Sequence, residues 1–216
     1  MTHMIDTTAA QLGFDALLAD AEADNRAHKF AGKTAHLPGT MAEATPYFRV
    51  LIDQNHAAVM AANEAETRRL HEEVRLLAEK LDKGSRGILA HDDAPGNVLA
   101  RETKASVGSA PLWGQTGAFV IEAAGMAVRI EMEGMFGIGS GWGFWPGFAA
   151  HAVDPEKPFL SETGYRSFLG LHADPMPGHT PQSFTHLIIE RYVADALGGR
   201  PLEIGDRWKI SRGTDR

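Results

Sequence analysis

The spacing of apolar residues predicts helices in the first part of the chain. A first helix is expected over residues 9–30, with Gly32 as its end. A second helical pattern begins at Pro46, where Thr45 is placed to cap the helix, and it runs to Gly84. Its last four apolar residues are spaced 4, 3 and 4 positions apart and form one stripe that predicts burial. These residues are Leu70, Val74, Leu77 and Leu81.

The second pattern, residues 46–83, is compatible with one helix or with two. A single helix would be about 57 Å long at 1.5 Å per residue, which is large for a compact domain. A break at Asn63 and Glu64, giving an antiparallel helix pair, is therefore favoured. The same stripe also allows a homodimer through the 67–81 helix, although two heptads fall short of a coiled-coil signature.

The strongest strand signal lies in the middle of the chain. In residues 119–123 and 126–133 an apolar side chain recurs at every second position, charged residues such as Glu122, Arg129 and Glu131 lie between them, and Ala124-Gly125 separates the two runs. This pattern predicts a hairpin with one apolar face and one charged, hydrated face, as in an antiparallel sheet that is covered on one side.

The end of the chain carries a well-marked helix. Thr180 is expected at the N-cap, Pro181 at the first helical position, and Gly198 at the end. Short strands are expected at 168–171 and 202–204. The order of elements predicts an α+β fold, in which N-terminal helices pack with a small antiparallel sheet and a C-terminal helix. The expected parts, together one compact domain, are a helical region 1–83, a linker-like loop 84–110 and an α+β region 111–216.

An unusual segment, GMFGIGSGWGFWPG, occupies residues 134–147 and interleaves glycines with large apolar side chains. Glycine permits close backbone approach, so the segment is expected to press aromatic rings onto a core or a ligand. A glycine-bulged strand packed by aromatic residues is the favoured interpretation, and a pocket wall is the alternative. In the second case Trp142 and Trp145 would bind a ligand, with Trp113 and Gln115 contributing to the same cleft.

Polar residues suited to chemistry follow this segment. His151, Glu162 and Arg166 would be the catalytic residues if the protein were an enzyme, and Tyr165 with Arg166 could form a binding turn beside Trp145. The favoured alternative for Glu162 and Arg166 is a surface ion pair across one turn of a short helix.

The same part of the chain contains one weak metal-binding pattern. His172 and Asp174 have a spacing that places two ligands on one side of an extended segment, and His179 could be the third ligand of an iron site. Histidines that form local hydrogen bonds are the favoured interpretation. No cofactor can be identified from the sequence.

Composition excludes several classes of protein. The chain of 216 residues has no cysteine, which excludes disulfides, thiolate metal sites and cysteine nucleophiles. A net charge of −7 argues against a general nucleic-acid coat and against binding to anionic membranes. The N-terminus lacks the basic and apolar regions of a secretory signal, so a cytoplasmic location is expected.

Four blocks of sequence carry a resemblance to a known family. HLPGTMAEATPYFRVLIDQNHAAVMAA, PLWGQTGAF, GFWPGFAAHAVD and PFLSETGYRSFLGLHADP resemble proteins encoded on plasmids and genomic islands of alphaproteobacteria. The blocks cover most of residues 36–200. The resemblance implies a mobile genetic element as the context, and it implies no activity, fold or site residue.

These observations favour a non-enzymatic binding or accessory protein of a mobile element. Its binding surface would be the aromatic-glycine segment together with the polar turn around Tyr165, and its partner a protein or a small molecule. The alternative is an enzyme that uses acid–base or metal-assisted chemistry in a pocket near His151 and Asp174.

Overall fold

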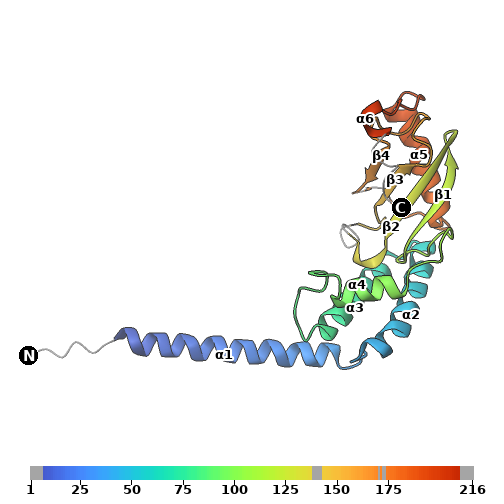
Figure 1. Ribbon diagram of the computed structural model, residues 1–216. Helices are drawn as coiled ribbons and strands as arrows, with labels where there is room; N and C mark the ends of the chain where they lie inside the picture. The colour runs from blue at the N-terminus through green and yellow to red at the C-terminus, as the bar shows by residue number, and fades with distance from the viewer. Residues whose placement is uncertain (1–6, 138–142, 170, 172–173, 210–216) are drawn as a thin grey trace, which may run out of the picture.

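A computed structural model describes residues 7–137, 143–169, 171 and 174–209. A long helix projects from a body that has helices next to this arm and a sheet at its far end (Figure 1). The elements are the helices α1 (Thr7–Thr34), α2 (Met41–Met60), α3 (Glu64–Leu81), α4 (Pro95–Glu102), α5 (Pro181–Ala196) and α6 (Asp206–Lys209), the 3-10 helix η1 (Gly134–Phe136), and the strands β1 (Thr116–Ala123), β2 (Met126–Glu133), β3 (Phe148–Ala152) and β4 (Tyr165–Phe168).

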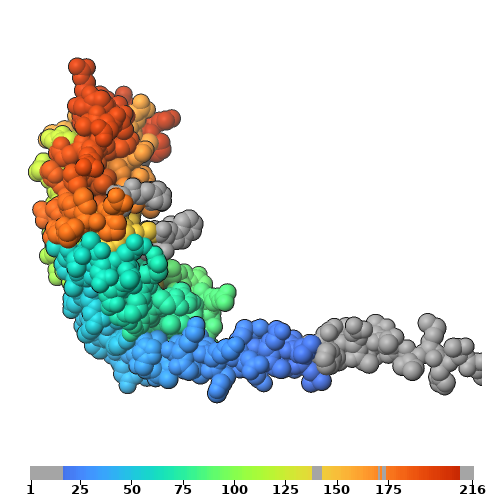
Figure 2. Space-filling view, turned by 180° about the vertical axis from the view of Figure 1, so that it is seen from behind, coloured from blue at the N-terminus to red at the C-terminus, as the bar shows by residue number. Residues whose placement is uncertain are grey.

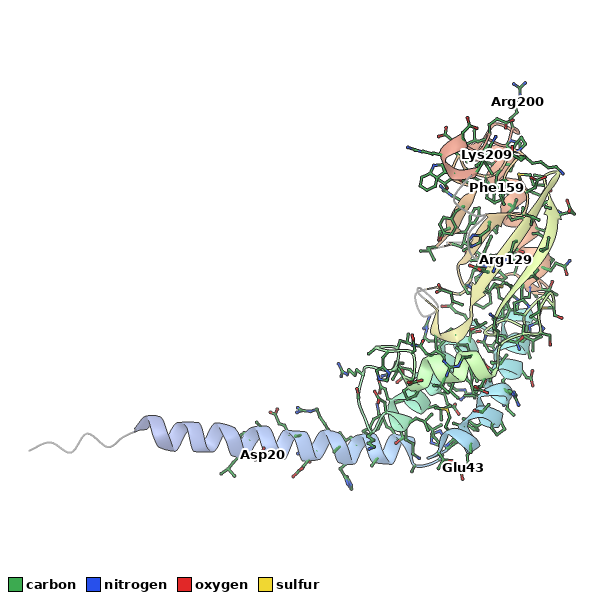
Figure 3. The ribbon with its side chains drawn as sticks, viewed as in Figure 1. Asp20, Glu43, Arg129, Phe159, Arg200 and Lys209 are labelled. Atoms are coloured by element: carbon green, nitrogen blue, oxygen red, sulfur yellow. The ribbon has the colours of Figure 1, made fainter. Side chains whose placement is uncertain are left out.

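The projecting helix α1 touches the body at its C-terminal end. Lys80 on α3 donates to the carbonyl oxygens of Thr34 and Leu37 at 2.8 and 2.5 Å, which fixes that end. Residues 17–29 are exposed, and side chains such as Asp20 extend into open space (Figure 3).

Helices α2 and α3 confirm the predicted break. The side chain of Asn63 caps α3 by accepting from the Glu66 N–H at 3.1 Å. The predicted start of α2 is wrong, because the helix begins at Met41 and encloses Pro46. Thr40 and Glu43 explain the difference: the Thr40 hydroxyl accepts from the Glu43 N–H at 3.4 Å and donates to the Glu43 carboxylate at 2.9 Å.

The predicted linker 84–110 contains a helix, α4, which corrects the sequence-based interpretation. Pro95 begins it, and Leu99 is fully buried against α2 and α3. The apolar stripe of α3 is buried in the same core, so its best contact surface is used within the chain. A homodimer through residues 67–81 stays a prediction and would have to use the charged face of α3.

The sheet confirms the predicted hairpin and the α+β class. Its strand order is β1-β2-β3-β4, and every neighbouring pair is antiparallel. Ala124 and Gly125 both have positive φ, at 50° and 74°, as a two-residue hairpin turn requires. The C-terminal helix α5 begins at Pro181, with Thr180 as its cap as predicted, and covers one face of the sheet.

Seen from behind, the orange residues that include α5 lie on the near side of the body (Figure 2). The opposite face of the sheet therefore looks toward the viewer in Figure 1. None of the helices in the described residues is both long enough and apolar enough to cross a membrane.

Candidate functional site

The aromatic residues expected to line a binding surface lie in the core instead. Trp113 is fully buried, and only 3% of the surface of Trp145 is exposed. The Trp145 ring stacks on Phe184 of α5 with centroids 4.3 Å apart, and the Trp113 indole N–H donates to the His179 carbonyl at 2.6 Å. The expectation of exposed tryptophans is therefore wrong for Trp113 and Trp145, while Trp142 lies outside the described residues.

Gln115 holds the loop that leads into β1. Its side-chain oxygen accepts from the Leu112 N–H at 3.0 Å, and its amide donates to the Thr103 carbonyl at 2.8 Å. The first contact closes a turn, and the second ties this loop to the end of α4, so the Gln115 side chain has a structural role.

The open face of the sheet brings together polar residues from three strands. Glu131 on β2, His151 on β3 and Tyr165 on β4 occupy this face because side chains alternate along each strand. The His151 Nε2 lies 2.9 Å from the Glu131 Oε2, and the rings of His151 and Tyr165 are 5.0 Å apart. Arg129, which extends from β2 in Figure 3, forms an ion pair with Glu131.

The electrostatics of this cluster centre on Glu131. Partial burial raises the pKa of its carboxyl group, but attraction to His151 and Arg129 and their hydrogen bonds outweigh the burial and lower the pKa below its ordinary value. The carboxylate is therefore charged at neutral pH and is held between two cation-forming side chains.

Three adjoining hollows form a furrow that crosses the open face and continues onto the helices. The first, of about 170 Å³, lies between Glu131 and Tyr165, and its floor includes Ala149. The second, of about 420 Å³, shares Glu131 and Gly137 with the first. It lies between the sheet and α4.

The third hollow, of about 380 Å³, shares Leu89 and Phe136 with the second. Its wall is mostly apolar, and it contains His71 of α3. Burial lowers the pKa of His71 to about 4, so the imidazole is neutral at pH 7 and this end of the furrow suits an apolar group.

The proposed catalytic residues do not converge. Arg166 lies on the face of β4 opposite to that of His151, with its guanidinium 4.7 Å from the centre of the Tyr192 ring. Glu162 is exposed in the turn 161–164, and its carbonyl accepts from the Gly205 N–H at 2.9 Å. The predicted short helix with a Glu162–Arg166 ion pair is absent, because this turn leads directly into β4.

The candidate metal ligands do not form a visible site. His172 lies outside the described residues. The Asp174 carbonyl accepts from the Trp145 indole N–H at 3.3 Å, and the His179 ring packs edge-on against Trp145. In the described part of the chain, no three histidine or carboxylate side chains gather closely enough to hold a metal ion.

Sequence reasoning missed Arg129 and Glu131 as site residues. Both belong to the charged face of the predicted hairpin, so the alternating pattern contained the signal. What was missing was β3, which places His151 opposite Arg129 and next to Glu131.

Comparison with known proteins gives a family similarity for the sheet region. The chain is 38% identical over 112 residues to a protein named Protein KlcB from Escherichia coli, a match that covers 51% of this chain and 27% of that protein. A second Protein KlcB from Escherichia coli is 42% identical over 83 residues, which cover 38% of this chain and 17% of that protein. The chain thus matches about a quarter or less of these relatives' length, and no solved structure gives a significant match. Residues 116–192, which contain all four strands and most of α5, match the model of the KlcB third domain.

Proposed function

We propose that the protein is a non-enzymatic accessory protein of a mobile genetic element, and that its furrow holds an extended segment of a partner protein. The observation that supports this proposal is that three adjoining hollows, each of which shares lining residues with the next, extend from the uncovered face of the sheet to α3. A row of three adjoining hollows suits a polypeptide in extended form better than a compact small molecule.

The chemistry along the furrow changes from one end to the other. The hollow beside α3 has a mostly apolar wall with charged residues of α3 beside it, and the hollow between Glu131 and Tyr165 offers carboxylate and hydroxyl groups. A partner segment would therefore place an apolar side chain beside α3 and polar side chains on the sheet, where the ion-paired Glu131 gives directional contacts.

The context of the proposal comes from similarity. The relatives named KlcB support an accessory role in general terms, and the resemblance to proteins of plasmids and genomic islands supports a mobile element. A cytoplasmic location is part of this proposal.

Site-specific photo-cross-linking in the native host tests the furrow. A benzoyl-phenylalanine at Ser167, which lines the first hollow, is expected to give a discrete adduct with one protein. The matched control places the same group at Ala196, which is exposed at the end of α5 on the opposite side of the sheet. Mass spectrometry of the adduct should map the cross-link to one continuous segment of the partner.

A synthetic peptide of that segment then provides a direct binding measurement. By fluorescence anisotropy, Ala149→Trp should weaken binding at least tenfold, because the new ring fills the floor of the first hollow. Equal adducts from both positions, or a peptide that binds the Ala149→Trp variant as tightly as the wild type, would reject the proposal.

Acid–base catalysis is the second candidate, and the 2.9 Å contact between His151 and Glu131 favours it. In this arrangement Glu131 would orient the imidazole and His151 would transfer the proton. Turnover of p-nitrophenyl acetate or p-nitrophenyl phosphate that disappears in His151→Gln and survives in the Ala149→Trp variant would replace the binding proposal with this one.

A further inference from the structure

The outer edge of β1 is an unprotected strand edge. β1 lies at the end of the sheet and pairs with β2 over all its eight residues without a bulge (Figure 1). Its sequence, TGAFVIEA, contains neither proline nor lysine, which commonly block such edges. The other edge strand, β4, has only four residues, so its shortness protects it.

The hairpin register determines which backbone groups face outward. Residues Ala123 and Met126 close the two-residue turn and form a hydrogen-bonded pair, so pairs alternate from that point along β1. Ala118, Val120 and Glu122 therefore direct their N–H and C=O groups away from β2. Thr116 has the same orientation, and its carbonyl accepts from the Ala105 N–H at 2.9 Å.

Within the described residues, the outward N–H and C=O groups of Ala118, Val120 and Glu122 have no hydrogen-bond partner in the protein. The side chain of Val120 is 54% exposed at the middle of this edge. A row of backbone donors and acceptors at strand spacing fits one kind of occupant, which is another extended chain.

We propose that this occupant is β1 of a second copy of the chain, which pairs antiparallel about a two-fold axis through Val120. The free stretch is symmetric about Val120, so Ala118 of each copy lies opposite Glu122 of the other and all the outward groups are used. No like charges face each other, and two β-branched valines meet at the axis.

The length of the free edge also fits this pairing. At one end of the free edge, the Ala105 N–H already bonds to the Thr116 carbonyl. At the other end, β1 finishes at the hairpin turn that begins with Ala124. In the proposed register Thr116 lies opposite the hairpin turn of the partner. The hydrogen bond from Ala105 to Thr116 therefore takes no strand–strand hydrogen bond away from the dimer. Both copies would place α5 on one side of a continuous sheet and their furrows on the other.

The absence of cysteine allows a sharp test in the full-length chain. In the Val120→Cys variant, the two cysteines of a dimer should form a disulfide under mild oxidation. Their Cα atoms would be about 5.5 Å apart, as in any hydrogen-bonded antiparallel pair. Glu122→Cys should not cross-link to itself, since the two copies of that residue would be about 13 Å apart. A mixture of Ala118→Cys and Glu122→Cys should cross-link.

Light scattering with size-exclusion chromatography gives the oligomeric state without cross-linking. The wild type should have twice the mass of its 23.4 kDa chain. Val120→Lys should weaken the dimer at least tenfold, because two lysines would meet at the axis, while the circular dichroism spectrum stays the same. A monomeric wild type, a dimer that tolerates Val120→Lys, or self-cross-linking of Glu122→Cys would each overturn the proposal.

Discussion

The two faces of the sheet differ in what their side chains do. On the face beneath α5, strand residues such as Phe119 and Ile130 belong to a continuous apolar core, in which Trp145 stacks on Phe184 of α5. On the open face, His151 contacts both Glu131 and Tyr165, and these two partners line the first hollow of the furrow. Both faces come from the same strands, because successive residues point to opposite sides.

The difference shows that aromatic content is a poor guide to the exposed surface of this protein. Trp113 and Trp145 stand out in the sequence, and both stabilise the interior. Glu131 and Arg129 are ordinary residues of an amphipathic strand, and they build the candidate site. Mutations on the two faces should therefore separate stability from binding.

The largest expected effect is that of Trp113→Ala on the covered face. Trp113 is the largest fully buried side chain among the described residues, so its removal leaves a cavity and should lower the free energy of unfolding by about 3–5 kcal/mol. Urea denaturation followed by circular dichroism measures this change. Its control on the open face is Tyr165→Ala, which removes a ring that is 43% exposed and should cost about 1 kcal/mol or less. Equal losses from both variants would contradict the assignment of different roles to the two faces.

The elements that could be predicted from the sequence are those with a local signal. The hairpin, the cap at Thr180 and the break at Asn63 each depend on neighbouring residues, and all three are confirmed. Strand β3 was not predicted, because Phe148–Ala152 is short and has three alanines. Its place in the sheet comes from pairing with β2, which is a tertiary interaction.

The candidate site depends on that missed strand. His151 was singled out for its chemistry, but its partner Glu131 is twenty residues earlier in the chain and on another strand. Glu162 and Arg166 are nearer to His151 in sequence, yet the turn and the alternation of β4 direct them elsewhere. Proximity along the chain is a weak guide where strands bring distant residues together.

A second prediction extends the comparison to the helical end of the furrow. Burial lowers the pKa of His71 from 6.5 to about 4, so the folded protein binds this proton less readily than the unfolded chain. The stability due to neutral His71 is complete above pH 6.5 and is lost as the pH falls toward 4. The loss should be on the order of 2 kcal/mol.

The His71→Gln variant tests the predicted direction of this pH dependence. Its free energy of unfolding, measured from pH 7 to pH 4, should fall less steeply than that of the wild type. Glu72 lines the same hollow, and its hydrogen bond to Arg75 lowers the pKa of its carboxyl group, so Glu72 also loses stabilisation as the pH falls below its ordinary pKa. That loss occurs in both proteins and cancels in the comparison of variant with wild type. Parallel curves for variant and wild type would show that the imidazole is already hydrated in the folded state.

The smallest expected effect is that of Glu131→Gln on the open face. The pKa of Glu131 in the folded protein lies below its ordinary 4.5, so its ion pair with Arg129 and its hydrogen bond with His151 stabilise the protein above that pH. This contribution is lost as the pH falls through the folded pKa. Because the Glu131 side chain is 40% exposed, the difference between wild type and variant at pH 7 should be only about 0.5 kcal/mol.

The pH dependence distinguishes this small effect from a packing change. The gap between wild type and Glu131→Gln should close below pH 4.5, whereas a packing defect would persist at every pH. Glu162→Gln is the matched control, since Glu162 is exposed and forms no ion pair with any described residue. If the difference in free energy of unfolding stays constant with pH, or if Glu162→Gln reproduces it, Glu131 acts by filling space. The open face would then not differ from the covered face in its electrostatics.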